Sequence, residues 1–469
     1  MSYEIIKKLI SGSILLLSLF STFYLLLFVN EEGFEFIWVL PLTFGLCYPF
    51  LSKAVENEQL TIFFSFFTGV SFLRYVAGPF LLSYTNDYFG LIMNVRPSIH
   101  ALHVATYLMV YELIACSLIV YFFSKRQFFQ SKAPSYLTLP KSYLFYMVFV
   151  FISALFVLRN PSIIYFFSFG IWGMNDLELS TLTTSAQATI MLAISAKFVL
   201  FWILLSWIKS KHDSSNFPFL WKFLGAVVTF ILGFLYYGGN RAQFLFSLIS
   251  SFYIFILFFP NLKRIVILLS FVFGVIVLSF MTDQRNYFDY YSYEKGTRNK
   301  ILNTSQTITA YFGGLTNVAI GVDMAERFSD RRNGSQVLRD VLLPVVGLNK
   351  LITFEKKETS NTLFNYVFFN SKKVTSQILP SIAHGYFFFG PIFCVLMDVL
   401  QFIFIFFLII ILKKTRRMEL VFIFNVVLFR FSLMFGQNIT QQINGIAMQL
   451  VLPMCVYWLN NQISLTRKE

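Results

Sequence analysis

Apolar runs of membrane-spanning length recur along this chain of 469 residues and limit what it can fold into. A helix needs about 20 predominantly apolar residues to cross a bilayer, and runs close to that length return from residue 9 to residue 459. Hydrophobic residues make up 57% of the chain and charged residues only 13%. Charges are rarely tolerated inside a bilayer, which explains their scarcity here. The sequence therefore predicts an all-α polytopic membrane protein.

The short connections between these runs predict the orientation of the chain. Cytoplasmic loops of membrane proteins carry an excess of lysine and arginine, and we expect about twelve transmembrane helices with both termini cytoplasmic. The expected spans lie at about 9–29, 36–51, 60–82, 99–123, 142–158, 188–208, 219–237, one ending near 259, 265–281, 386–412, 420–435 and 445–459. The basic residues that agree with this orientation are Lys7, Lys8, Lys53, Lys125, Arg126, Lys209, Lys211, Lys263, Arg264, Lys413, Lys414, Arg467 and Lys468.

One long segment, from Thr282 to His384, lacks a membrane-length apolar run. A connection of this length is either disordered or functional, and its many Tyr, Phe, Leu and Val residues argue against disorder. We expect a folded extracytoplasmic loop between the ninth and tenth spans. The predicted parts are thus transmembrane helices 1–9 (residues 1–281), the loop domain (282–385) and helices 10–12 (386–469).

The loop is rich in basic residues. It holds 13 basic and 9 acidic side chains, a net charge of +4. Arginine binds phosphate and carboxylate groups in a bidentate manner, so an arginine-rich outer loop fits an anionic ligand at the membrane surface. The alternative is a solvated face with local ion pairs, such as Asp323 with Arg327 one helical turn later. The candidate ligand-binding arginines of the loop are Arg285, Arg298, Arg327, Arg331 and Arg339.

Charged residues inside the expected spans form a second group of candidates. Arg74, Lys197 and Arg430 are the cations, and Glu112 and Asp398 are the acids available to pair with them. An ionisable residue inside a membrane marks a functional site by default, with a partner expected. A purely structural ion pair is the alternative.

Three further residues stand where expected spans meet the outer surface. Arg241 follows Gly238, Gly239 and Asn240, and glycines let the backbone approach a ligand closely. Arg159 ends the fifth expected span. Both arginines could instead be helix-end side chains that extend to the interface. His384 lies where the loop re-enters the membrane, and a histidine there can act as a general base or simply form a structural hydrogen bond.

Several classes of function lack support in the sequence. No HExxH, P-loop, GxGxxG or CxxC pattern occurs, so we expect no metal, no cofactor and no cytosolic nucleotide chemistry. The four cysteines lie within apolar runs without paired spacing. The net charge of +14 reflects membrane topology rather than affinity for nucleic acid.

About twelve expected spans, the turn GGNRAQFL, the large outer loop and the closing segment LPSIAHGYFFFGP together resemble the Wzy-type polymerases of bacterial O-antigen and capsule repeat units. The resemblance implies a multi-pass glycosyltransferase of the bacterial inner membrane. Its substrates would be undecaprenyl-pyrophosphate-linked oligosaccharides, joined on the outer face of that membrane without a nucleotide sugar. A chain-length regulator and a flippase are the implied partners. Arg241 falls on the GNR motif, and His384 falls in the segment before the last Gly-Tyr-aromatic-Gly run.

The chemistry of that reaction fits the candidate residues. Cleavage of the donor leaves a pyrophosphate, so fixed arginines would stabilise the developing negative charge, and we expect Arg241 and Arg285 to be catalytic. The acceptor hydroxyl must lose a proton, which His384 could accept. Arg74, Arg159 and Arg430 join the loop arginines as expected substrate-binding residues. An O-antigen ligase and a polysaccharide flippase or other transporter remain open as alternatives.

Overall fold

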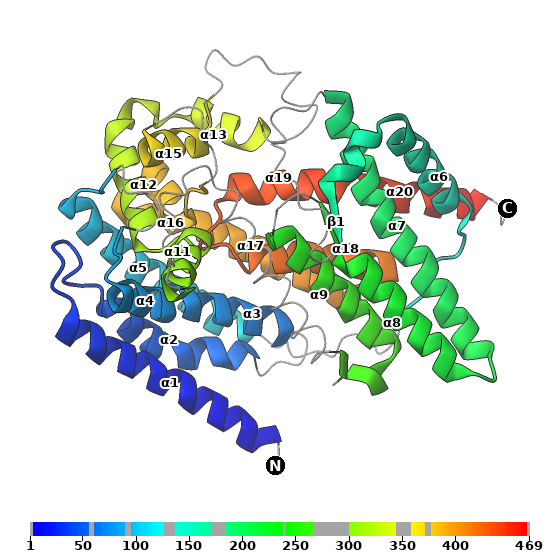
Figure 1. Ribbon diagram of the computed structural model, residues 1–469, viewed down its shortest axis with the longest axis horizontal. Coiled ribbons are helices and arrows are strands. Elements are labelled where there is room, and N and C mark those ends of the chain that lie inside the picture. The colour runs from blue at the N-terminus through cyan, green and yellow to red at the C-terminus, as the bar shows by residue number, and fades with distance from the viewer. Residues whose placement is uncertain are drawn as a thin grey trace. The chain divides into compact units, whose positions relative to one another are not determined.

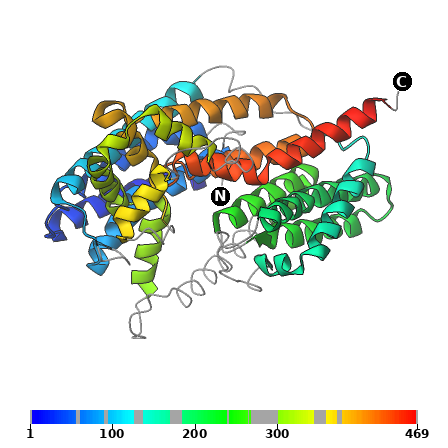
Figure 2. The same cartoon turned by 90° about the horizontal axis from the view of Figure 1, so that it is seen from above.

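The structure is a computed structural model of the whole chain. It describes residues 3–55, 61–89, 95–125, 137–169, 184–237, 241–263, 265–266, 300–343, 358–370 and 377–466. Helices make up nearly all of this part of the chain (Figures 1 and 2). The exception is a pair of antiparallel three-residue strands, β1 (Phe167–Phe169) and β2 (Leu235–Tyr237). The predicted helical fold class is confirmed at this level.

Five described helices are long and apolar enough to cross a membrane. A bent pair, Ile439–Ala447 and Val451–Ile463, would make a sixth span if its 42° bend lies within one crossing. Three further apolar helices are shorter, at Leu144–Arg159, Pro218–Phe234 and Leu245–Phe258. The expected count of twelve is therefore not confirmed, and most of the expected ninth span lies outside the described residues. The five long helices are Lys8–Phe28, Phe63–Thr85, Ile99–Ser124, Ala188–Ser214 and Leu396–Lys414.

The chain forms two compact units, each assembled from separate stretches of sequence. Unit 1 comprises Met1–Lys132, Gly296–Ile410 and Phe431–Asn444. Unit 2 comprises Ala133–Lys295, Ile411–Arg430 and Gly445–Glu469. Most of the expected loop domain thus folds together with the first spans. The side of the membrane on which it lies stays a prediction.

In unit 1, helix α5 lies between α2 and α12, and α12 also packs on α15 and α16. In α12, all the residues from Leu315 to Val322 are buried. This burial makes α12 a core element rather than a surface one. The helices of unit 1 are α1 (Tyr3–Phe28), α2 (Val39–Val55), α3 (Thr61–Phe72), α4 (Gly78–Thr85), α5 (Ile99–Ser124), α11 (Lys300–Phe312), α12 (Leu315–Arg327), α13 (Gly334–Leu342), α15 (Ser360–Phe369), α16 (Ser381–Phe393) and most of α17 (Leu396–Lys414).

Several helices of unit 1 are interrupted. The helical stretch formed by α11 and α12 breaks at Gly313, whose φ of 63° lies in the left-handed region that favours glycine. Helix α16 is kinked at Gly390, with φ 72°, just before Pro391. Between α3 and α4 the chain forms one π-helical turn, Leu73–Ala77.

Unit 2 is built around α7, which packs on α6, α8 and α20. The side chain of Trp202 on α7 is fully buried and contacts the rings of Tyr146 and Phe422. Its helices are α6 (Leu144–Arg159), α7 (Thr184–Ser214), α8 (Pro218–Phe234), α9 (Arg241–Phe258), α18 (Met418–Phe431, up to Arg430) and α20 (Val451–Thr466).

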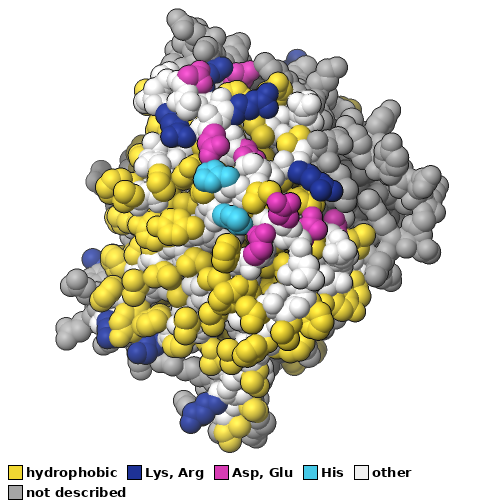
Figure 3. Space-filling model, turned by 90° about the vertical axis from the view of Figure 1, so that its left-hand side faces the viewer, with side chains coloured by type: hydrophobic (Ala, Val, Ile, Leu, Met, Phe, Trp, Pro, Cys, Tyr) yellow, Lys and Arg dark blue, Asp and Glu magenta, His cyan; other side chains and the backbone are white. Residues whose placement is uncertain are grey.

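The molecular surface supports a membrane location for unit 1. Figure 3 shows the side on which α5 and α12 lie, with acidic, basic and histidine side chains gathered towards its top. A broad band of hydrophobic side chains lies below them, and the charged side chains in view along the lower edge are lysines and arginines. An apolar band with basic residues at one border is what a lipid-facing surface requires.

Candidate functional site

Arg74 lies in the π-helical turn between α3 and α4, within the candidate span Phe63–Thr85. A π turn inserts an extra residue into a helix and is frequent at functional sites. The side chain of Arg74 is only 1% exposed. The structure therefore holds a permanent positive charge inside an apolar helix that is a candidate membrane span.

Glu112 on α5 is the counter-ion of Arg74. Arg74 Nη2 lies 3.0 Å from Glu112 Oε2, and both side chains are fully buried. The hydroxyl of Tyr75 donates a hydrogen bond of 2.8 Å to the same carboxylate oxygen. The guanidinium also lies 5.1 Å and 5.2 Å from the ring centroids of Phe435 and Tyr75, distances at which aromatic rings attract a cation. The expected pairing of Arg74 with one of the two buried acids is thus present, with Glu112.

Much of the hydrogen-bonding capacity of Arg74 is unused. A guanidinium carries five N–H donors, and Nε and Nη1 have no hydrogen-bond partner among the described residues. A buried donor without an acceptor costs about 1–3 kcal/mol, and more when the group is charged. The geometry thus leaves room for a further acceptor at this arginine.

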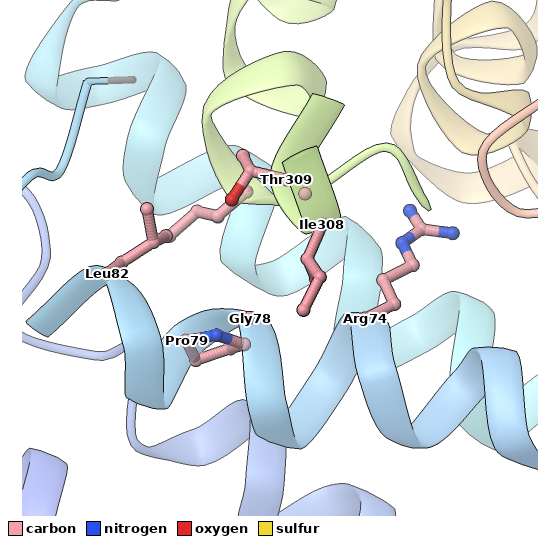
Figure 4. A pocket seen from close by; sticks show the side chains of 8 residues that line it. Arg74, Gly78, Pro79, Leu82, Ile308 and Thr309 are labelled. Carbon is pink, nitrogen blue, oxygen red and sulfur yellow. The ribbon is translucent and has the colours of Figure 1, made fainter. Parts of the chain in front are cut away.

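A small pocket opens beside Arg74. Its cavity volume is only about 10 Å³, room for roughly one water molecule, and residues of α4 and of the α11–α12 break form part of its wall. Figure 4 shows Arg74 at one end of the row of lining side chains and Leu82 at the other, with Ile308 between them. The lining is otherwise apolar, so the pocket joins an apolar body to one cationic end. The lining residues are Arg74, Gly78, Pro79, Leu82, Ile308, Thr309, Gly314 and Leu315.

Non-helical backbone from separate stretches of sequence meets next to this pocket. A Cβ added at Gly313 would lie 3.0 Å from the Cα of Gly436 and 3.1 Å from the ring of Pro380. A Cβ at Gly436 would lie 2.7 Å from the carbonyl oxygen of Tyr311. Irregular backbone at membrane depth occurs only where it is buried in protein or lines a cavity. The broken helices of unit 1 therefore converge on the part of the molecule that contains Arg74.

A second buried carboxylate, Asp398 on α17, completes the charged group. It is fully buried and lies within electrostatic range of both Arg74 and Glu112. Ser381 is its polar neighbour, and the hydroxyl of Ser381 accepts a 2.9 Å hydrogen bond from Gln401 Nε2. The pocket thus has one buried cation and two buried acids near it.

His384 forms a separate buried pair with Asp340 of α13. His384 Nε2 lies 3.0 Å from Asp340 Oδ2, and each side chain is 1% exposed. The other carboxylate oxygen accepts hydrogen bonds from the Ser360 backbone N–H (2.8 Å) and from Gln336 (3.3 Å). Because a carboxylate only accepts, Nε2 carries the proton and Nδ1 is the free basic nitrogen. Nδ1 has no partner in the described residues, but it is closed off from solvent, so proton transfer there requires an opening.

The described loop arginines are engaged in local contacts. Arg339 is buried and donates to the Ser335 carbonyl at 3.3 Å. Arg331 lies 3.4 Å from Glu358, and Arg327 lies over the ring of Tyr366. Such contacts favour the alternative of local pairing for these three residues.

The pair expected between Asp323 and Arg327 takes a different form. Both carboxylate oxygens of Asp323 accept hydrogen bonds from Ser98, the N-cap residue of α5, at 2.8 and 3.1 Å. Asp323 thus fixes the start of α5 on α12, while Arg327 lies over an aromatic ring.

Of the remaining candidates, Arg159 and Arg430 belong to unit 2, and the others lie partly or wholly outside the described residues. Arg159 is exposed at the end of α6. Arg430 is buried in unit 2, where its guanidinium packs against Gly445 so closely that a Cβ there would collide with it. Arg241 begins α9, but its side chain is not among the described parts of the chain. Arg285 and Arg298 lie outside the described residues.

Lys197 in unit 2 shows that burial and an acid partner do not always coincide. Its ammonium donates to the Leu235 carbonyl and to the Ser247 hydroxyl. The expected acid partner is replaced by these neutral acceptors.

Two features of the Arg74 site were missed at the level of sequence. The roles of Tyr75 and of the Ser381–Gln401 pair depend on contacts between segments far apart in the chain. Only the adjacency of Tyr75 to Arg74 gave a signal in the sequence. Comparison with protein-family models, with curated proteins and with solved structures finds no match.

Proposed function

We propose that Arg74 and its pocket bind the pyrophosphate of a lipid-linked oligosaccharide, and that the protein joins such units into O-antigen or capsular polysaccharide. The observation that carries the proposal is a fully buried arginine with unused donors beside an apolar pocket in a membrane-spanning helix. A lipid pyrophosphate has the matching parts, an apolar chain and an adjacent anion, and its entry requires this pocket of about 10 Å³ to widen. The sequence resemblance to Wzy-type polymerases supports the same substrate class.

The proposed reaction transfers the growing chain from its lipid pyrophosphate to a sugar hydroxyl. The bond between the anomeric carbon and the pyrophosphate oxygen breaks, and negative charge develops on that oxygen. A preorganised, permanently charged donor in a dry site stabilises this charge with little reorganisation. Glu112 and the rings of Tyr75 and Phe435 hold the guanidinium in place for that role.

The acceptor hydroxyl loses a proton as the new glycosidic bond forms. His384 Nδ1 is the proposed base, and Asp340 would stabilise the imidazolium through Nε2. Since His384 is buried, this step includes an opening that exposes Nδ1 to the acceptor. Arg241 and Arg285 stay proposed catalytic residues, and the other outer arginines stay proposed contacts to the oligosaccharide.

The proposed setting is the bacterial inner membrane with both termini cytoplasmic. A flippase would deliver the lipid-linked units, and a chain-length regulator would be a further partner. A ligase would use the same donor and differ only in its acceptor.

A transporter of an anionic lipid or sugar is the second candidate, because one specific observation favours it. Discontinuous helices that bring buried charges together in the membrane are typical of secondary transporters, and unit 1 has both features. A transporter would bind its anion at Arg74 without breaking a glycosidic bond.

Deletion of the gene, followed by gel analysis of surface polysaccharide, separates these functions. A polymerase mutant leaves a single repeat on the lipid acceptor, and a ligase or flippase mutant leaves none. Restoration with Arg74→Gln should give mostly single repeats, whereas Arg96→Gln, an exposed arginine beside Phe89, should restore the full ladder. Complete absence of surface repeats in the deletion strain would refute the polymerase and favour the ligase or the transporter.

A further inference from the structure

The charges around Arg74 do not balance. Arg74 is one cation, while Glu112 and Asp398 are two carboxyl groups, and all three side chains are buried. Arg74 interacts electrostatically with both acids. With both acids ionised, the site would carry a net charge of −1 away from water, which is costly inside a protein.

Within the described residues, only the hydroxyl of Ser381 and the charge of Arg74 favour the ionised form of Asp398. Neither of its carboxyl oxygens accepts a hydrogen bond of normal length within the described part of the chain, and Oε1 of Glu112 is likewise unpaired. The groups that face Asp398 are Glu112 and Cys116 from α5, Arg74 from the π turn, Ser381 from α16, and Cys394 before α17. Arg74 is the only cation among them, and its nearest carboxylate is Glu112.

A bound proton resolves this imbalance. With one proton shared by the two carboxyl groups, the net charge of the site is zero. Burial favours this state, because it disfavours the charged form of an acid. Two interacting acids of this kind titrate as a pair, so the proton belongs to the pair.

An anion bound at Arg74 raises the affinity of the two carboxyl groups for that proton. A pyrophosphate that links a lipid to a sugar carries two negative charges and does not itself titrate near neutral pH. Its arrival next to two ionised carboxylates would place like charges together in a dry site. Whatever anion binds there, its affinity and the protonation of the pair must influence each other reciprocally.

We propose that the Glu112–Asp398 pair is a proton-binding site, and that an anion binding at the Arg74 pocket takes up one proton there. This inference rests on the proposed anion binding at Arg74. The proton comes from solvent and ends on a carboxyl oxygen of the pair, and no covalent bond of the ligand changes. Above the pH at which the empty site loses its proton, the dissociation constant rises about tenfold per pH unit.

The test is titration calorimetry on the purified full-length protein in detergent. The probe is a farnesyl-pyrophosphate-linked monosaccharide, measured at several pH values in two buffers with different ionisation enthalpies. The proton uptake should rise with pH towards one per ligand. Asp398→Asn, which mimics a permanently protonated acid, should bind the probe with little uptake and little pH dependence, while Glu35→Gln, a change at a surface carboxyl, should behave like wild type.

The outcomes are separable. Binding without proton uptake, or the same uptake in Asp398→Asn as in wild type, overturns the inference and leaves anion binding intact. No binding by wild type at any pH removes both the proposed site and the inference. If the Asn variant does not fold, infrared difference spectra of wild type decide the question. A new protonated-carboxyl band on probe binding supports the inference, and its absence overturns it.

Discussion

Substitution of Arg74 by methionine removes the buried charge but keeps a long apolar side chain. The substitution leaves Glu112 without its counter-ion, and the hydroxyl of Tyr75 is then its remaining hydrogen-bond donor among the described residues. Both members of the pair are fully buried at 3.0 Å, and removal of one partner from such a pair costs about 3–5 kcal/mol. That cost corresponds to a loss of roughly 100-fold or more in the ratio of folded to unfolded protein.

A double-mutant cycle isolates the part of this cost that belongs to the pair. Glu112→Gln alone leaves the guanidinium without its counter-ion, and the double variant Arg74→Met/Glu112→Gln leaves neither charge. We expect the double variant to be less destabilised than the sum of the single changes, with a coupling of about 2–3 kcal/mol. Asp398 is present in all four proteins. Its contribution to stability therefore cancels from the coupling energy when its protonation is the same in each of them.

The assay is reversible unfolding of the purified protein in mixed micelles, followed by circular dichroism. The exposed pair of Glu35 and His103 provides the control, since its side chains are 48% and 40% exposed. Such a pair contributes about 0–1 kcal/mol. Two results would contradict a stabilising buried ion pair. One is that Arg74→Met and a substitution in the Glu35–His103 pair change stability by the same small amount. The other is that the effects of Arg74→Met and Glu112→Gln are additive.

Three further predictions follow from other parts of unit 1. Hydrogen bonds from the neighbouring histidine and backbone lower the pKa of Glu35 to about 2, below its usual value near 4.5. Its stabilising contribution should therefore be complete above about pH 4.5 and fade towards pH 2, so the difference in Tm between wild type and Glu35→Gln should shrink over that range. His384→Ala leaves the buried carboxylate of Asp340 without its partner. Loss of this hydrogen bond should lower stability by about 1–3 kcal/mol, and Asp340→Asn should restore part of it. In Gly385→Ala the new methyl would collide with the carbonyl of Cys394. Expression of folded protein should fall sharply, and an unchanged Tm would contradict the turn after α16.

Sequence reasoning reached the helical class because hydrophobic periodicity and run length are local properties. It could not foresee the π turn at Arg74, because no residue there requires one. The number of crossings also depends on how short helices such as Leu144–Arg159 lie in lipid, which run length alone does not decide.

The candidate site was predictable only in part. Arg74 could be selected because a charge inside an apolar run needs a reason. The choice of Glu112 rather than Asp398 as its closest partner is made by the packing of α5 against the π turn, which no local pattern encodes. Arg327 and Arg331 were predicted as ligand contacts from charge alone, but Tyr366 contacts the first and Glu358 the second.

Reconstitution tests the central proposal most directly. Purified wild-type protein, Arg74→Gln and the surface variant Arg96→Gln are placed in liposomes with single repeat units linked to undecaprenyl pyrophosphate, and the lengths of the lipid-linked chains are measured. The account predicts long chains from wild type and from Arg96→Gln, with a rate roughly 100- to 1000-fold lower for Arg74→Gln. Single repeats that stay unjoined with wild-type protein, or equal chain growth by Arg74→Gln and wild type, would contradict it.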